Sequence, residues 1–193
     1  MNISEIKVDY SKYEGKNLLS VIFDKQRTLI DLYDVPSVDL DVPKDQQVLR
    51  VLAWSVIEEA AEAIDVIKTT NDPEHLRDEV ADLTHFFIEL LILSGFTYKD
   101  FESELPVPRK QESVEQTFTD FSVQLALAIN VLKNRFWRKT NLKTDQNFYR
   151  TQLKLSISLF LAFVFSLNLT FDEMIDSYLR KNEINLFRIR SNY

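Results

Sequence analysis

The chain has 193 residues, a formal net charge of −7 and a hydrophobic fraction of 45%, enough apolar material for one domain with a sizeable core. It contains no cysteine, which excludes disulfides, thiolate metal sites and cysteine nucleophiles. The negative charge disfavours broad binding to nucleic acids or anionic membranes. Only 2 glycines and 5 prolines are present, a composition that favours long helices over frequent tight turns.

Neither the N-terminal segment nor the most apolar segment of the chain has the pattern of a targeting signal or a membrane span. The N-terminal segment 1–16 has no apolar run, so we expect no signal peptide. The most apolar stretch, 153–167, is shorter than a membrane span and carries Lys154 and three serines. We therefore expect a soluble cytoplasmic protein without membrane association.

Apolar periodicity and capping residues predict an all-α fold, a bundle of about six helices in one domain over residues 1–193. Asp72 and Pro73 form a helix-start signal, and Gly95 is a natural helix stop. Proline-containing segments are predicted as a loop at 34–45 and as a connector with one helical turn at 97–112. The predicted helices, in chain order, are about 16–33, 46–69, 73–94, 113–138, 145–167 and 170–185.

Two segments of the chain resemble each other. Residues 75–100 align with residues 148–173, and both end in a threonine, an aromatic residue and acids. In the second segment Gln152 and Leu155 stand where Glu79 and Asp82 stand in the first. The similarity indicates either a degenerate internal duplication, in which one half kept the acids, or simply two apolar, capped helices.

Four acids indicate a metal site. Glu59 and Glu62, and then Glu79 and Asp82, are each spaced i, i+3, so both members of a pair share a helix face. A short turn between the two helices should make them antiparallel, with the pairs opposed. The surrounding sequence is apolar on nearly every side, and a buried carboxylate must be paired, protonated or bound to metal. Converging carboxylates suit a hard cation such as Mg²⁺; a solvated acidic face is the alternative.

A di-iron carboxylate site is the other metal hypothesis. It requires an acid-x-x-His motif on each of two helices. Asp82 and His85 could supply one motif, but the second would need Asp72 and His75 at a helix start. We therefore expect His85 to be a packed, hydrogen-bonded residue and His75 to lie at the surface.

The acidic pattern is ExxE followed by ExxD, with Glu79 17 positions after Glu62. It resembles the all-α nucleoside triphosphate pyrophosphohydrolase superfamily, which includes dimeric dUTPases, phage dCTPase/dUTPases and MazG proteins. The C-terminal YLRKNEINLFRIRSNY resembles the closing motif of the dimeric dUTPase branch. Gln26, in FDKQRTL, stands where that branch has a glutamine near the base. Asn192 replaces the family's usual glycine, and a Trp-Lys-rich stretch after the first acidic pair is missing, with Lys68 as a partial substitute.

The resemblance implies Mg²⁺-dependent hydrolysis of dUTP, with dCTP as an alternative substrate, to the monophosphate and pyrophosphate by a homodimer. Two or more Mg²⁺ ions would be held by Glu59, Glu62, Glu79 and Asp82. Glu62 would be the catalytic base, and Glu58 would support the ligands. The residues implied in substrate binding are Gln26, Lys181, Asn182, Asn185, Arg188 and Tyr193. A broader MazG-like pyrophosphatase and a non-catalytic helical interaction protein are the alternatives.

A basic cluster surrounds two aromatic residues at positions 136 and 137. It could bind phosphates or nucleic acid, with the aromatic rings stacking on bases. The alternative, a helix C-terminus stabilised by its dipole, is the one we expect, so that nucleic acid is not a predicted partner. The cluster consists of Lys133, Arg135, Arg138, Lys139 and Lys143.

Overall fold

The computed structural model describes residues 3–101, 113–135 and 137–191. Tyr193, Asn192, Phe136 and most of the predicted connector lie outside these residues. The described chain contains six α-helices and no strand, which confirms the all-α prediction. The elements are η1 Ile3–Glu5, η2 Tyr10–Tyr13, α1 Leu18–Leu32, α2 Pro43–Thr69, α3 Pro73–Leu93, η3 Tyr98–Asp100, α4 Val114–Val131, α5 Gln146–Ser166 and α6 Phe171–Arg190.

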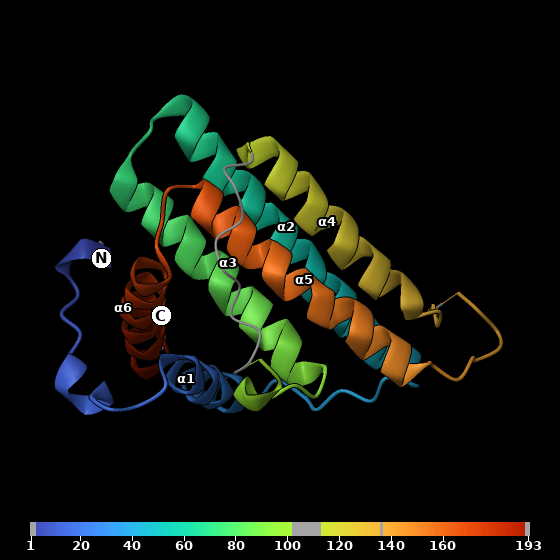
Figure 1. The fold of residues 1–193 in the computed structure, drawn as a ribbon. Helices are drawn as coiled ribbons and strands as arrows, with labels where there is room; N and C mark the ends of the chain where they lie inside the picture. Colours follow the sequence, from blue (N-terminus) through green and yellow to red (C-terminus); the bar gives the residue numbers. More distant parts are fainter. Residues whose placement is uncertain (1–2, 102–112, 136, 192–193) are drawn as a thin grey trace.

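Helices α2 to α5 run side by side as a bundle, in which α2 packs along α3 and α4 along α5 (Figure 1). Helices α1 and α6 pack on α3 and on each other at one side of this bundle. Helix α3 is therefore the central element, since it contacts α2, α1 and α6.

Within the described ranges, no single helix is long and apolar enough to span a membrane. Helices α5 and α6 meet the criterion only as a pair bent by 94°.

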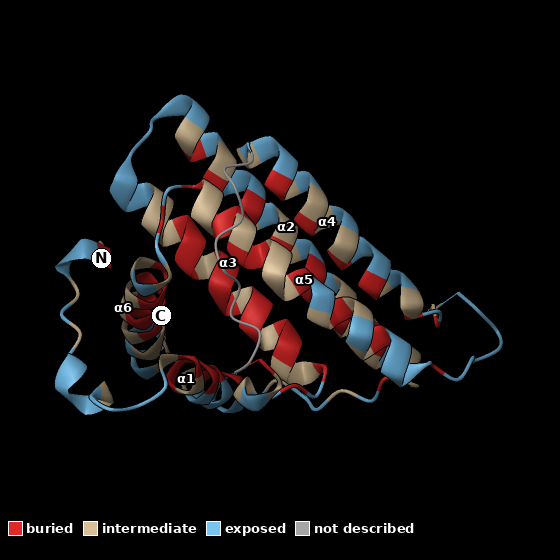
Figure 2. Ribbon diagram, viewed as in Figure 1, coloured by how far each residue is buried: buried red, intermediate tan, exposed pale blue. Residues whose placement is uncertain are grey.

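The core of the bundle is aromatic. Phe87 of α3 stacks on Phe160 of α5 at a centroid distance of 4.5 Å, and Phe121 of α4 meets the edge of Phe87 at 5.5 Å. All three rings are almost completely buried, and Figure 2 shows buried residues along the inner faces of these helices. Such pairs stabilise the packing beyond their area alone, so they fix the position of α3 in the bundle.

The α2–α3 turn places the two acidic pairs opposite each other. Asp72 caps α3 by accepting hydrogen bonds from the backbone N–H groups of Glu74 and His75, at 2.9 and 3.4 Å, and Pro73 occupies the first helical position. Asn71 adopts a left-handed conformation with φ of 51°, which asparagine tolerates. The predicted helix start and the antiparallel arrangement are therefore confirmed.

Three predicted helix boundaries are wrong. The fourth helix ends at Val131 instead of 138, because the next residues bond to α2: the Arg50 guanidinium donates to the Leu132 carbonyl, and the Asn134 N–H donates to Gln46. The second helix begins at Pro43 instead of 46, since proline is well suited to the first turn. The last helix continues to Arg190 instead of 185, with basic side chains favourable at its C-terminus.

The similar segments occupy equivalent places. Helices α3 and α5 are each the second helix of a hairpin, and each is followed by a threonine that opens a capping box, Thr97 with Asp100 and Thr170 with Glu173. This equivalence supports an internal repeat. A duplication as its origin stays a prediction.

Candidate functional site

Three of the four predicted acids converge between α2 and α3. Glu59 from α2 and Glu79 and Asp82 from α3 each offer one carboxylate oxygen, and these oxygens lie within 4.8 Å of one another. Glu79 is buried, and the other two are half-buried. The expected i, i+3 pairing on facing helices therefore produces a compact cluster of oxygen ligands.

The electrostatics of this acidic cluster are unfavourable without a cation. Burial raises the pKa of Glu59 to about 8, assisted by the negative charges of Asp82 and Glu62. Burial also raises the pKa of Glu79, with Glu62 adding to the effect and His75 opposing it. Burial likewise raises the pKa of Asp82 although Lys181 opposes the rise. A bound cation would relieve both the desolvation and the mutual repulsion.

Glu62 and Glu58 lie outside the converging group. Glu62 is exposed, but it is close enough to raise the pKa of both Glu59 and Glu79. Glu58 is also exposed and accepts a hydrogen bond of 2.7 Å from the Trp54 indole. The supporting role predicted for Glu58 therefore has no contact in its favour among the described residues, whereas Glu62 borders the cluster on its solvent side.

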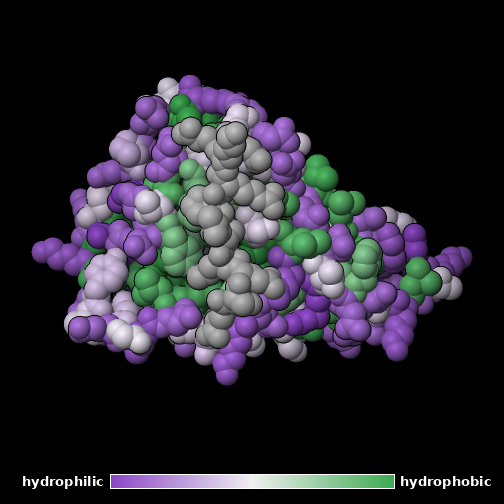
Figure 3. Space-filling view, viewed as in Figure 1, coloured by the Kyte–Doolittle hydropathy of each residue, from purple (hydrophilic) through white to green (hydrophobic). Residues whose placement is uncertain are grey.

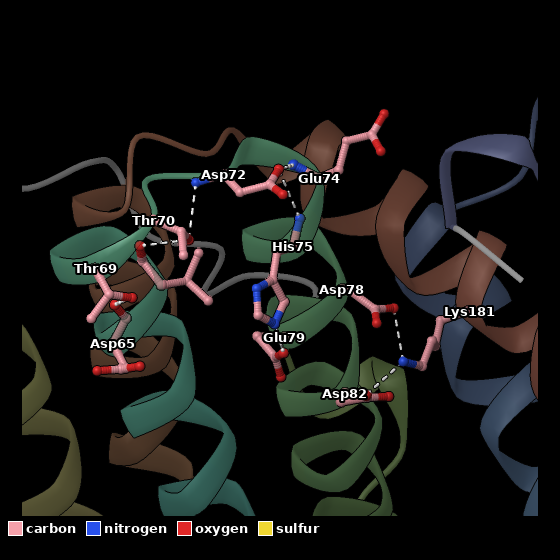
Figure 4. A network of polar contacts seen from close by, with 11 residues as sticks. Asp65, Thr69, Thr70, Asp72, Glu74, His75, Asp78, Glu79, Asp82 and Lys181 are labelled. Carbon is pink, nitrogen blue, oxygen red and sulfur yellow. Dashed lines mark hydrogen bonds and ion pairs between the residues drawn. The ribbon is translucent and has the colours of Figure 1, made fainter.

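Basic side chains reach the α3 acids from the sides (Figure 4). The buried Lys181 Nζ of α6 lies 2.6 Å from Asp82 Oδ2 and 2.8 Å from Asp78 Oδ1. His75 Nε2 lies 2.7 Å from Glu79 Oε1. His75 is at the surface, as predicted, but it also contacts a predicted ligand. The partners of the α3 acids thus come from two places: Lys181 from α6, far along the chain, and His75 from the preceding turn of α3.

One face of α6 is directed toward these acids. Lys181, Asn185 and Arg188 are spaced i, i+4, i+7, so they share a helix face. Arg188 is near enough to lower the pKa of Asp82. The sequence expectation that Lys181 and Arg188 face the same side is therefore supported by their shared neighbour, and Asn185 lies half-buried between them.

A buried hydrogen-bond network surrounds Gln26 of α1. Its Oε1 lies 2.8 Å from His85 Nδ1 and accepts a hydrogen bond of 3.0 Å from the Tyr178 hydroxyl. Its Nε2 donates to the Glu89 carboxylate at 3.1 Å. Burial lowers the pKa of His85 to about 3, so the ring is neutral and donates through Nδ1. The orientation of the Gln26 amide is fixed by three partners.

Two polar groups beside this network lack partners. His85 Nε2 and both polar atoms of the Asn182 amide are buried and form no hydrogen bond with the part of the chain that the structure describes. Asn182 is near enough to lower the pKa of Tyr178, which burial holds well above its usual range, but their geometry is not that of a hydrogen bond. Asn182 also lines a cavity of about 330 Å³ between α1, α6 and the segment containing Tyr13. Buried unsatisfied groups are costly, and of the two only Asn182 lines this cavity.

A larger cavity, of about 440 Å³, lies between η1, the start of α3 and α6. Its charged residues are already paired, Arg77 with Glu173 at 2.6 Å and Arg180 with Asp176 at 2.8 Å. None of the three acids of the cluster lines it. Size alone therefore does not mark the functional site.

Comparison with known proteins decides the family. The family model described as dUTPase matches residues 18–193, which include every element from α1 to α6. The chain belongs to the dimeric all-α dUTPase family. Searches of curated proteins and of solved structures found no significant match.

Membership of the dUTPase family makes the chain one of a group of nucleoside triphosphate hydrolases, as the sequence resemblance implied. The matched range contains all the described residues predicted for the site, from Gln26 to Arg188. Tyr193 lies outside the described residues. Lys68, which we expect to compensate in part for the missing Trp-Lys stretch, pairs with Glu115 of α4 at 3.3 Å.

Several residues at this dUTPase-family site were not singled out from the sequence. Asp78 holds Lys181, while Glu89 and Tyr178 hold Gln26. A signal was available: Asp78, Asp82, His85 and Glu89 are spaced i, i+4, i+7, i+11, so they share one face of the helix. Here that face meets α6 through Asp78 and Asp82 and α1 through His85 and Glu89.

The donor set fits a hard divalent cation. Glu59, Glu79 and Asp82 offer only oxygen atoms, which Mg²⁺ prefers, and a fourth carboxylate stands beside them. The pKa of Glu59 is raised by burial and by repulsion from the neighbouring carboxylates, and a bound cation would relieve both effects. The rival di-iron arrangement has no support, since Asp72 is used as the α3 cap and His85 faces Gln26.

Proposed function

We propose that the chain hydrolyses dUTP to dUMP and pyrophosphate in a Mg²⁺-dependent reaction. The single observation that carries this proposal is the convergence of Glu59, Glu79 and Asp82 within 4.8 Å, in a chain that belongs to the dUTPase family. A non-catalytic helical protein would gain nothing from inward acids that repel one another.

Glu59, Glu79 and Asp82 would hold Mg²⁺, and Glu62 would complete the site from the solvent side. Bound there, Mg²⁺ neutralises phosphate charge and lowers the pKa of a water molecule. Two or more ions remain the prediction for the number bound. Lys181, at 2.6 Å from Asp82, partly offsets the negative charge of these carboxylates.

Glu62 is the proposed general base. It is the one member of the acidic quartet that is exposed, so its carboxylate has access to the water that attacks the α-phosphate. Its effect on the pKa of both Glu59 and Glu79 supports a position beside the ligands. A base must lie within hydrogen-bond reach of the proton it accepts, and Glu62 borders the ligands on that side.

The basic face of α6 is proposed to bind the phosphates. Arg188 is exposed and has no ion pair with any residue in the described ranges, so its guanidinium can bind two phosphate oxygens at once. Lys181 contributes a fixed positive charge beside the acids, and Asn185 offers an amide between them. This arrangement places the triphosphate between α6 and the acidic cluster.

The Gln26 network supports uracil over cytosine. Because His85 donates through Nδ1 to Gln26, its unpartnered Nε2 can only accept. The N3–H of uracil would satisfy this acceptor, whereas the N3 lone pair of cytosine would oppose it. The low pKa of His85, about 3, prevents protonation from reversing the preference. The Asn182 amide can donate and accept, so it suits either base.

A homodimer and a single domain over residues 1–193 are proposed with this activity. Large apolar side chains, Val51 and Trp54 on α2 and Val123 and Leu127 on α4, are each more than half exposed on neighbouring helices. Apolar patches of this kind mark protein interfaces. Both α1 and α6 pack on α3, which supports one domain. The predicted cytoplasmic location stays a prediction.

A nucleotide panel tests the proposal. Purified protein is incubated with dUTP, dCTP, dTTP or UTP and Mg²⁺, and the products are separated and quantified, beside a Glu62→Gln variant. We expect dUMP and pyrophosphate from dUTP, much slower reaction of the other three, and loss of turnover in the variant. Equal turnover of all four nucleotides would instead place the chain with broad MazG-like pyrophosphatases, and no turnover at all would contradict the proposal.

A further inference from the structure

The loop between α4 and α5 carries a concentration of positive charge. Residues 132–144 include five cations and no acid, in a chain whose net charge is −7. The loop lies where α2 begins, at the end of the bundle away from the C-terminal half of α2 that bears Glu59 (Figure 1). Its cations therefore do not serve the acidic cluster. They are Lys133, Arg135, Arg138, Lys139 and Lys143.

Buried polar side chains hold this basic loop from beneath. Asn134, only 1% exposed, donates to the carbonyls of Asp41 and Leu142 at 3.0 and 2.9 Å, and its Oδ1 accepts from the Leu142 N–H at 2.7 Å. The Thr144 hydroxyl donates to Leu40 and accepts from Gln46. With both ends fixed in this way, Arg138, Lys139 and Lys143 between them are exposed to solvent.

The basic loop is not neutralised within the protein. Lys133, Arg138, Lys139 and Lys143 are exposed, and none of the loop's five cations forms an ion pair with a residue that the structure describes. In addition, Arg135 Nη1 is buried without a hydrogen-bond partner. Elsewhere on the surface, cations such as Arg77 and Arg180 do pair with acids. Hydrophilic side chains dominate this end of the molecule, with isolated apolar ones between them (Figure 3).

An exposed aromatic ring lies among the cations of the basic loop. Trp137 is 65% exposed and directly precedes Arg138. An exposed indole among cations provides a stacking surface for an unpaired base, while the cations contact the phosphates on either side. The expectation that these cations belong to a helix C-terminus is wrong, because α4 ends at Val131, before all of them. In place of the expectation that nucleic acid is not a partner, we propose that the basic loop binds single-stranded nucleic acid through its phosphates and through stacking on Trp137.

The form of the loop favours this partner over a lipid surface. Residues 137–144 contain turns and bends and no helix, so insertion into a bilayer would remove exposed backbone N–H and C=O groups from water without replacement partners. Binding to phosphates leaves these groups hydrated. Duplex DNA would leave Trp137 without a base to stack on, because its bases are already stacked and paired.

The two tryptophans of the chain allow a direct test. In a Trp54→Phe variant, Trp137 is the sole tryptophan, and its fluorescence reports on the loop alone. Titration with a 20-nucleotide oligothymidylate should quench this fluorescence. With about four phosphate contacts, the affinity should fall about 50-fold between 50 and 200 mM salt, since the slope for single strands is about −0.7 per contact.

Charge-reversal variants distinguish binding at the basic loop from nonspecific attraction to other cations on the protein surface. Arg138→Glu combined with Lys139→Glu should lower the affinity about tenfold or more, whereas the same charge change at the exposed Lys7 and Lys99 should leave it within about twofold. Turnover of dUTP should be unchanged in both. No binding at 50 mM salt, equal loss in both variants, duplex binding without a fluorescence change, or binding only to anionic phosphatidylserine vesicles would each overturn the proposal.

Discussion

Replacing Glu59 by glutamine should stabilise the metal-free protein and abolish its stabilisation by Mg²⁺. The pKa of Glu59 is raised in the folded state to about 8 from 4.5. Below pH 4.5 the carboxyl is protonated in both states and costs nothing. Between pH 4.5 and 8 the unfolded chain releases this proton while the folded chain retains it, so the stability of the folded state falls as pH rises. Above pH 8 the full cost is present.

The magnitude follows from the shift. A rise of the pKa from 4.5 to about 8 corresponds to an upper bound of about 5 kcal/mol, at about 1.36 kcal/mol per unit. Because Glu59 is half-buried and partly screened by water, we expect about 1–2 kcal/mol. For a chain of this size that is a rise in Tm of about 2–8 °C. Glutamine mimics the protonated carboxyl, so the gain should vanish toward pH 4.5.

Thermal unfolding with and without Mg²⁺, at pH 8.5 and pH 4.5, measures both effects. Mg²⁺ should raise the Tm of the wild type at pH 8.5 and leave that of Glu59→Gln unchanged. Glu58→Gln is the matched control, since Glu58 is the next residue but is exposed and bonded to Trp54; its Tm should follow the wild type. If Glu59→Gln destabilises the protein at pH 8.5, or still responds to Mg²⁺, the carboxylates do not form the strained ligand set described here.

Three further predictions concern the α6 face, the base and the core. Lys181→Met should lower kcat/KM for dUTP about 10- to 100-fold, because it removes a fixed charge 2.6 Å from Asp82. The control is Lys25→Met, which breaks a 3.1 Å ion pair with Glu183. Equal loss of kcat/KM in both variants would argue against a specific role of Lys181. His85→Gln should reduce the ratio of kcat/KM for dUTP to that for dCTP at least about tenfold, since an amide can rotate to present a donor; an unchanged ratio would show that His85 does not sense the base. Phe87→Ala should cost about 3–5 kcal/mol of unfolding free energy in urea titrations, because the ring stacks on Phe160 in a nearly sealed core; a cost below about 1 kcal/mol would contradict the packing.

The sequence contained enough to predict the helices and the acidic cluster because both depend on local spacing. Glu59, Glu79 and Asp82 meet because i, i+3 pairs share a face and the α2–α3 turn is short, and Asp72 with Pro73 marks that turn. The same local logic failed at the end of α4. There Arg50 and Gln46 of α2 bond to the chain after Val131, and no nearby residue signals such a contact.

The partners of the site residues could not be predicted, because they come from distant segments. The substrate-binding role of Lys181 stays a prediction, and the sequence does not signal that this side chain also pairs with Asp78 and Asp82, about a hundred positions earlier in the chain. The orientation of the Gln26 amide depends on Tyr178 and Glu89 from two other helices. Spacing identifies which side chains share a face, but not which neighbour packs against that face.

The most direct test of the central claim is the rate of pyrophosphate release from dUTP as the Mg²⁺ concentration is varied, in the wild type, Glu79→Gln and Glu58→Gln. We predict a saturable dependence on Mg²⁺ in the wild type and in Glu58→Gln, and a loss of activity in Glu79→Gln, whose parent carboxylate is one of the three that converge. Full activity of Glu79→Gln, or turnover that is independent of divalent cations, would contradict the account.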